Sequence, residues 1–273
     1  MTTRPLQEDS TNLGVEVAAS APRAKGARSP VRWHSVSSTR EYELCPRRYR
    51  YAYVERLPQD RHVPIPWRIG SAVHAALEAA YHVKQGDATT PLKAAIPQSL
   101  AALQRSWETL ELPQDDRYRR AARHVVRSLR EDVLQVGEVV GVELPLRDDL
   151  SPSNRVAGFL DLLLRRNGST MEIVDHKVTS RRANATDVAA DFQLNLYGAL
   201  VRARWPSVGT VRATLHYPTG PDRVTATLYD EGMEAAHARV ERVAERASAD
   251  TSFTPIPGEH CNHCPWRPRC PAG

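Results

Sequence analysis

The hydrophobic positions of this chain follow two different spacings. From about residue 33 to residue 136 they mostly recur every three or four residues, as in amphipathic helices, and from residue 138 they follow the patterns of strands. The helical spacing then returns twice. The pattern predicts strands over residues 139–146, 158–164, 171–177, 211–217 and 223–229, and helices over 37–44, 71–80, 186–200 and 231–249, with two or three more between 92 and 135.

The stretch 158–177 is predicted to form a hairpin at the centre of this pattern. Its two strand-like runs are joined by a turn that contains Asn167-Gly168, a dipeptide favoured in tight hairpin turns. Because side chains alternate between the faces of a strand, Asp175 and Lys177 should project to the same side. Pairing of the two strands could then bring Asp161 beside Asp175.

Paired carboxylates are the ligands that a hard divalent cation needs, so this hairpin is a candidate metal site. The simpler interpretation of Asp175 and Lys177 alone is a surface ion pair, which contributes little to stability. Other candidate residues in the chain favour the first interpretation. We therefore expect a metal-dependent centre that cleaves phosphodiester bonds.

Two of these other candidates precede the hairpin. His74 lies in the first turns of an alanine-rich helix, after an expected loop over 64–70, and a histidine there is either structural or a metal ligand. Glu143 lies in the strand predicted over 139–146, where Pro145 indicates an edge or a strand end. Glu143 is therefore either a third acid of the site or an edge-strand charge.

Two further segments carry side chains of interest. Gln193 and Tyr197 are four residues apart and should share one face of the helix predicted over 186–200, with Thr186 as its cap. Residues 47–54 interleave arginines with tyrosines. Such a run can hold phosphates and stack on bases, or it can be an amphipathic segment with packed tyrosines and solvated arginines.

Composition and charge limit the class of protein. The chain has 273 residues and a formal net charge of +5, which is a modest indication of an anionic partner. No apolar run has the length of a membrane span, and the start of the chain lacks the apolar core of a signal peptide, so we expect a cytoplasmic protein with no membrane partner. Residues 1–30 lack hydrophobic periodicity and are expected to form a disordered leader.

The four cysteines have the spacing of a metal centre. Three of them, Cys261, Cys264 and Cys270, lie close together near one end of the sequence, and Cys45 lies near the other. Disulfides are disfavoured in a reducing cytoplasm, so convergence of four thiolates on a metal is the better interpretation. Both a tetrahedral zinc ion and a [4Fe-4S] cluster accept four cysteines, and the spacing leaves the choice open.

The order of these motifs resembles that of a known nuclease family. The set comprises Gly70 and His74, Glu143, Gly158 and Asp161, Asp175 and Lys177, and Gln193 and Tyr197. It is similar to the RecB-like branch of the PD-(D/E)XK nuclease superfamily, and Cys45-Pro46-Arg47-Arg48 with the C-terminal cysteines resembles its iron-sulfur subgroup, which includes the CRISPR adaptation nucleases. The resemblance covers residues 37–270.

This resemblance implies a fold and a domain organisation. The expected fold is the restriction-endonuclease-like α/β core, in which a mixed sheet is flanked by helices. Residues 31–273 would form a single nuclease domain, with a helical insertion over about 84–136 and a cysteine tail over 255–271. By the same resemblance the four cysteines would hold a [4Fe-4S] cluster, with structural zinc as the alternative, and would staple the N-terminal helix to the C-terminal tail.

The resemblance also implies roles for individual residues. His74, Asp161, Asp175 and the backbone carbonyl of His176 would bind Mg²⁺ or Mn²⁺. Lys177 would position or activate the attacking water, and Gln193 and Tyr197 would line the site and help orient DNA. The role of Glu143 stays open between a ligand, a supporting acid and an edge charge.

The function implied is a metal-dependent deoxyribonuclease in DNA repair, recombination or defence. We expect an exonuclease that acts on single strands or ends. The alternative is a catalytically idle nucleic-acid-binding subunit of a larger helicase-nuclease or CRISPR adaptation complex. The sequence contains no P-loop of the form Gly-x4-Gly-Lys-Ser/Thr, so any helicase partner would be a separate chain.

Overall fold

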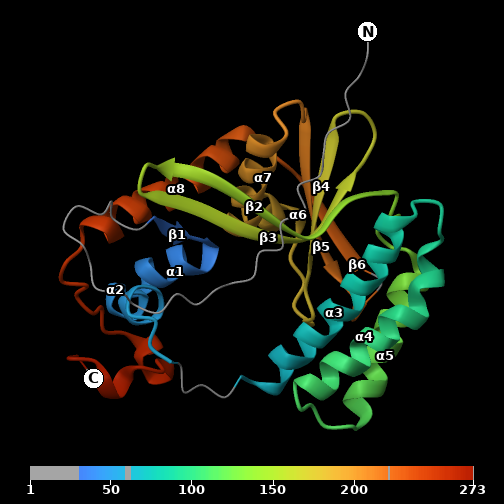
Figure 1. The fold of residues 1–273 in the computed structure, drawn as a ribbon, viewed down its shortest axis with the longest axis horizontal. Helices are drawn as coiled ribbons and strands as arrows, with labels where there is room; N and C mark the ends of the chain where they lie inside the picture. The colour runs from blue at the N-terminus through green and yellow to red at the C-terminus, as the bar shows by residue number, and fades with distance from the viewer. Residues whose placement is uncertain (1–30, 59–62, 221, 273) are drawn as a thin grey trace. The chain divides into compact units, whose positions relative to one another are not determined.

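The computed structural model describes residues 31–58, 63–220 and 222–272 (Figure 1). The leader predicted over residues 1–30 lies outside the described residues. In the part of the chain that is described, no helix combines the length and the hydropathy that a bilayer crossing requires.

Within the described residues, six strands form one mixed sheet. The order is β1-β3-β4-β5-β6, and β2 pairs with β3 outside this path. The pairs β1–β3 and β4–β5 are parallel, and the other pairs are antiparallel. The strands are β1 (Arg32–His34), β2 (Glu138–Ser151), β3 (Asn154–Arg165), β4 (Thr170–His176), β5 (Thr210–Tyr217) and β6 (Asp222–Leu228).

Helices cover the sheet, and two separate hydrophobic clusters lie between them and the strands (Figure 1). One cluster joins the sheet to α7 and α8, and the other joins it to α3, α4 and α5. The helices are α1 (Val36–Leu44), α2 (Pro46–Tyr49), α3 (Ile65–Gly86), α4 (Ile96–Thr109), α5 (Asp116–Glu131), α6 (Ala185–Ala190), α7 (Phe192–Arg204) and α8 (Asp230–Ala249), with a π-helical segment at Arg50–Val54 and 3₁₀ turns at Leu92–Ala95, Glu259–His263 and Arg267–Arg269.

The long strands β2 and β3 exchange faces halfway along their length. Leu160 packs in the cluster with α7 and α8, but Leu162 packs in the cluster with α3. Strict alternation would put both side chains on the same side of the sheet. In β2 the exchange of faces occurs at Glu143, whose backbone has a φ of 44°. The register Val142↔Leu162 and Leu144↔Leu160 places Glu143 opposite Asp161 at this crossover.

The restriction-endonuclease-like α/β fold predicted from the sequence is confirmed, and so are its central hairpin and most other strands. Residues 64–70 are not a loop, because α3 begins at Ile65, with Pro66 in its first turn, and runs through Gly70. A proline is tolerated there, since the first helical N–H groups have no intrahelical acceptor. The strand β1 was not predicted, because three residues are too few for a period to show.

The helix predicted over 186–200 is in fact two helices. Asp191 ends α6 and caps α7, accepting a hydrogen bond from the backbone N–H of Leu194 at 2.9 Å. Asn184, not Thr186, caps α6, in a capping box with Asp187. A side chain that can cap also competes with the backbone for hydrogen bonds, so an aspartate inside a helical pattern can start a new helix.

The N-terminal helices pack against the C-terminal part of the chain. Tyr42, Tyr49 and Phe253 belong to a small hydrophobic cluster that also contains residues of α8. The hydroxyl of Tyr42 donates to Asp250 at 2.9 Å, and the hydroxyl of Tyr51 donates to the carbonyl of Arg269 at 3.0 Å. These contacts hold residues about two hundred positions apart in sequence against each other.

Candidate metal-dependent active site

The central hairpin places Asp161 of β3 against the end of β4. The backbone N–H of His176 donates to Oδ2 of Asp161 at 2.7 Å. The register Leu162↔Val174 continues to this point, so Asp161 and Asp175 are cross-strand neighbours, as the sequence predicts. The parallel strand β5 holds the backbone of Lys177 in place, because the N–H of Lys177 donates to the carbonyl of His216 at 2.8 Å.

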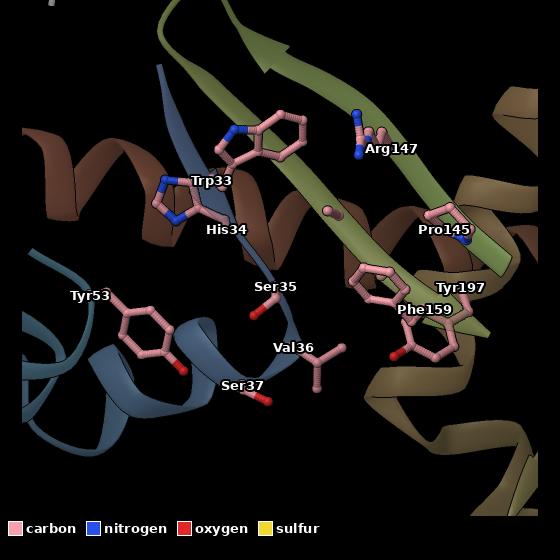
Figure 2. Close-up of a pocket in the computed structure, with 12 residues that line it drawn as sticks. Trp33, His34, Ser35, Val36, Ser37, Tyr53, Pro145, Arg147, Phe159 and Tyr197 are labelled. Carbon is pink, nitrogen blue, oxygen red and sulfur yellow. The ribbon is translucent and has the colours of Figure 1, made fainter. Parts of the chain in front are cut away.

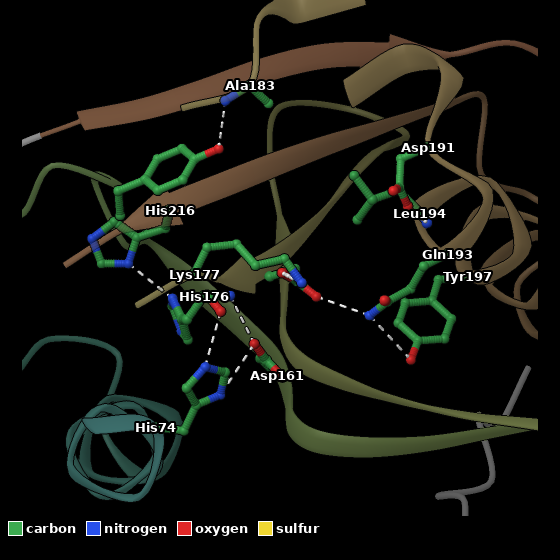
Figure 3. A network of polar contacts seen from close by, with 12 residues as sticks. His74, Asp161, His176, Lys177, Ala183, Asp191, Gln193, Leu194, Tyr197 and His216 are labelled. Carbon is green, nitrogen blue, oxygen red and sulfur yellow. Dashed lines mark hydrogen bonds and ion pairs between the residues drawn. The ribbon is translucent and has the colours of Figure 1, made fainter. Parts of the chain in front are cut away.

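Helix α3 brings His74 to this hairpin (Figure 3). Nε2 of His74 lies 2.9 Å from the carbonyl oxygen of His176. A carbonyl oxygen can only accept a hydrogen bond, so Nε2 carries the proton. In the neutral imidazole Nδ1 then presents a lone pair, and it faces Oδ2 of Asp161 at 3.5 Å. Two electron-rich atoms that face each other in this way favour a cation between them.

Glu143 completes this group of ligand atoms. One atom from each of His74, Glu143 and Asp161 lies within 4.8 Å of the others, and among the described residues these three are the group that could hold a metal ion. Burial raises the pKa of Glu143 to about 7, and the charges of Asp161 and Glu78 add to the shift. Glu143 therefore lies beside the other candidate ligands, although β2 is an edge strand, and its role in the site stays a prediction.

Asp175 and Lys177 form an ion pair beside this group (Figure 3). The Nζ atom of Lys177 lies 2.7 Å from Oδ2 of Asp175, which is 6% exposed. Burial raises the pKa of Asp175 to about 6, against the opposing effect of Lys177, and Asp161 raises it further. The side chain of Lys177 is 41% exposed, so it can also reach a substrate.

Helix α7 contributes the amide and the phenol expected from the sequence. Nε2 of Gln193 donates to Oδ1 of Asp175 at 2.9 Å and lies 3.5 Å from the hydroxyl of Tyr197. The ring of Tyr197 packs directly over Gly158, where an added Cβ would overlap the ring. Burial raises the pKa of Tyr197 to about 12, with Asp175 as the next cause, so its hydroxyl stays protonated.

The structure thus divides the predicted residues into two adjoining sets. His74, Asp161 and Glu143 converge on one point, and the carbonyl of His176 is bonded to His74. Asp175 is outside that group, since its two oxygens contact Lys177 and Gln193. Its predicted role as a metal ligand therefore stays a prediction.

A buried chain of polar groups behind the site was missed from the sequence. Nδ1 of His176 lies 2.8 Å from Nδ1 of His216, and Nε2 of His216 lies 3.0 Å from the hydroxyl of Ser128. Burial lowers the pKa of His176 well below its usual value and that of His216 to about 4, so both rings are neutral. His176 also stacks on Tyr81, with ring centroids 5.5 Å apart. These contacts orient the backbone that bonds His74 and Asp161.

A second feature missed is Glu78, which lies one helical turn beyond His74 on α3 and whose charge raises the pKa of Glu143. The spacing of four residues was a signal that could have found it, because such residues share a helix face. The pairing of His176 with His216 had no comparable signal, since it depends on the register of two parallel strands.

The four cysteines line one small cavity where the N- and C-terminal parts of the described chain meet. Its volume is about 20 Å³, and Arg47, Arg48 and Arg267 also line it. All four cysteines are free of disulfides, and Cys45 is buried. The structure therefore brings Cys45 to the C-terminal cysteines, as expected from their spacing.

Comparison with known proteins supports the nuclease interpretation. A family model described as the PD-(D/E)XK nuclease superfamily matches residues 34–271. No curated protein matches the chain. A crystal structure from Eubacterium rectale, titled "Putative exonuclease", is 12% identical, with a TM-score of 0.54 over 85% of this chain and 87% of that one, and it is similar in fold.

Another solved structure, of the protein SSO0001, is 15% identical, covers 90% of this chain and 89% of that one, and has a TM-score of 0.41. The family match extends over almost all of the described residues and includes every residue of the site. The chain therefore belongs to the PD-(D/E)XK nuclease superfamily.

Proposed function

We propose that this protein is a metal-dependent nuclease that hydrolyses phosphodiester bonds in DNA, and that it acts on single strands or ends. The observation that carries this proposal is the convergence of His74, Glu143 and Asp161 beside the ion pair of Lys177 and Asp175. Carboxylates with one imidazole suit Mg²⁺ or Mn²⁺. The net charge of +5 favours a polyanionic substrate.

The donor set fits a divalent cation on physical grounds. The charge of Asp161 raises the pKa of Glu143 and that of Asp175. A bound cation would relieve this repulsion and let Glu143 and Asp175 ionise. When bound, the metal would supply Lewis-acid activation of the scissile phosphate and of the attacking water.

The protein's own groups would do the remaining work. Lys177 is held at the end of β4 by its ion pair, from which its exposed amine can donate a hydrogen bond to a phosphate oxygen or to the attacking water. Gln193 holds Asp175 in place from the opposite side. Tyr197 keeps its proton and can donate it in a hydrogen bond to the substrate backbone.

The test is digestion of end-labelled single- and double-stranded DNA with Mg²⁺ or Mn²⁺. Lys177→Ala and Asp161→Ala should each reduce cleavage by at least about 100-fold, the usual scale for loss of a group that stabilises developing charge. Glu234→Gln, at an exposed position on α8, serves as the control and should cleave like the parent. Cleavage at the parental rate by either site variant would contradict the mechanism.

The alternative function is that of an idle nucleic-acid-binding subunit. The structure retains both acids of the hairpin, the lysine and a group of ligand atoms, which favours the enzyme. Binding of DNA without cleavage under either metal would favour the idle subunit. Membership in the RecB-like branch, a separate helicase or adaptation-complex partner, and a role in repair, recombination or defence stay predictions.

We also propose that Cys45, Cys261, Cys264 and Cys270 hold a [4Fe-4S] cluster with a structural role. The four cysteines line one cavity, so their thiolates could converge on a single cluster. The three arginines that line the cavity would offset the negative charge of the thiolate-bound cluster.

The metal content of protein prepared without oxygen tests this proposal. Iron and labile sulfide in equal amounts, with a brown colour, are the expected result. Colourless protein that contains one zinc per chain would contradict it and would favour the structural zinc site.

A further inference from the structure

A groove lined by aromatic rings, shown in Figure 2, shares Tyr197 with the candidate active site. Its volume is about 480 Å³, within the roughly 300–1,000 Å³ range of ligand sites. Four rings line it, from β1, the π-helical segment, β3 and α7: Trp33, Tyr53, Phe159 and Tyr197. We call these residues, together with Arg147 of β2, the aromatic groove.

The groove exists because one edge of β3 is only partly paired. On that edge β1 pairs with residues 154–156 and β4 pairs with residues 162–165. Between these segments the described registers pair β3 only with β2, on the opposite edge. The lining residues Ala157 to Phe159 fall in this gap, so the break in the sheet opens a hollow.

Three rings of the aromatic groove are exposed, and the fourth, that of Tyr197, is buried. Trp33 is 44% exposed, Tyr53 39% and Phe159 60%. Large apolar side chains gathered at the surface in this way usually mark a binding site. Cations lie close by, with the guanidinium groups of Arg147 and Arg155 at 5.3 and 5.7 Å from the centroid of the Trp33 ring.

The groove is continuous with the candidate active site. Tyr197 lines the groove, and its hydroxyl lies against Gln193, which in turn bonds Asp175. Phe159 is two residues from Asp161 on the same strand, a separation of roughly 7 Å. A ligand in the groove would therefore extend directly to the metal-binding side chains.

We propose that the aromatic groove binds the unpaired bases of single-stranded DNA next to the scissile phosphate, with bases stacked on Trp33 and Phe159 and with Arg147 near the backbone. This inference rests on the proposed nuclease function and deepens it. Aromatic platforms with flanking cations bind single strands because every base has a face that can stack. In a duplex those faces are already stacked on neighbouring bases, so a duplex could not use the rings.

Equilibrium binding of fluorescent oligothymidylate to the full chain tests the proposal. The measurement is made in EDTA, so that binding is observed without cleavage. Trp33→Ala and Phe159→Ala should each weaken binding by about 5- to 100-fold, the usual range for loss of one stacking platform. Trp33→Phe should retain most of the affinity. Tyr229→Ala, which removes a ring that is 70% exposed outside the groove, is the matched control and should bind like the parent.

Unchanged binding by both alanine variants, with melting temperatures like that of the parent, would overturn the proposal. So would tighter binding of blunt duplex or of oligouridylate than of oligothymidylate. A loss of binding shared by Tyr229→Ala would also overturn it. If the parent binds single strands through these rings but cleaves no DNA with Mg²⁺ or Mn²⁺, the groove stands and the nuclease function fails.

Discussion

At the scale of single residues, the candidate site contains carboxyl groups that are poorly solvated and lie close to the charge of Asp161. Glu143 and Asp175 both have a raised pKa, in each case mainly because of burial and further because of Asp161. The backbone of Glu143 adopts a positive φ that a glutamate rarely takes, which costs of order 1 kcal/mol or more. A bound cation would offset the electrostatic part of these costs.

Replacement of Glu143 by glutamine should change the pH dependence of stability in the metal-free protein. The folded pKa of about 7 is above the usual value of 4.5, so the parent should lose stability as the pH rises from about 4.5 to 7. Glu143→Gln removes this loss. We expect it to be more stable than the parent by about 1 kcal/mol at pH 8, after allowance for solvent screening, and equal to it near pH 4.5.

Urea unfolding in EDTA at the two pH values provides the measurement, with Glu234→Gln as a control that should show no such change. Addition of Mg²⁺ at pH 8 should reverse the order, since the parent gains more from the metal than Glu143→Gln does. A constant difference between parent and variant at both pH values would contradict the assignment of a buried, repelled acid at this position.

At the scale of elements, the break between α6 and α7 sets the position of Gln193. Asp191 ends the first helix and caps the second, two residues before Gln193. The capping bond to the backbone N–H of Leu194 fixes the first turn of α7, and this turn carries the amide that holds Asp175. A continuous helix, as predicted from the hydrophobic spacing, would present Gln193 in another direction.

The two capping residues offer a comparison within one segment. Asp191→Ala and Asn184→Ala should each cost about 1 kcal/mol of stability, because each removes one side-chain cap. Only Asp191→Ala should also slow DNA cleavage, by several-fold, because only α7 carries Gln193. Urea unfolding and initial cleavage rates measure the two effects. Equal cleavage rates in both variants would show that the cap does not position the site.

The sequence predicted the elements that carry their own local signals. The hairpin with Asp161 and Asp175 was found from its alternation and its Asn-Gly turn, and the α/β class followed from the resemblance. The position of Glu143 beside His74 and Asp161 could not be predicted from the sequence, because it depends on how β2 twists against β3. The His176–His216 contact depends on strand register, which no local pattern contains.

At the scale of the whole molecule, the N-terminal helices pack against the C-terminal part of the described chain. Hydrophobic packing of Tyr42, Tyr49 and Phe253 provides one tie, and the proposed cluster in the cavity lined by Cys45 and the C-terminal cysteines would provide the other. A cluster that joined Cys45 to the C-terminal cysteines would close a loop of most of the chain and so restrict the unfolded state. The same region supplies Tyr53 to the aromatic groove, so the tie also supports a predicted substrate contact.

Loss of one thiol should therefore loosen this region before the rest of the fold. Cys45→Ser removes the only proposed ligand that comes from the N-terminal side. We therefore expect loss of the bound iron, a lower melting temperature and early proteolytic cleavage within residues 250–270. The helices α3, α4 and α5 should stay protected from the protease by their own hydrophobic cluster. His263→Ala, at an exposed position between two of the cysteines, is the control and should keep its iron and its resistance to protease. Cleavage that begins in α3–α5, or iron retained in Cys45→Ser at the parental level, would mean that the cysteines do not form the tie, and that hydrophobic packing alone holds the two ends together.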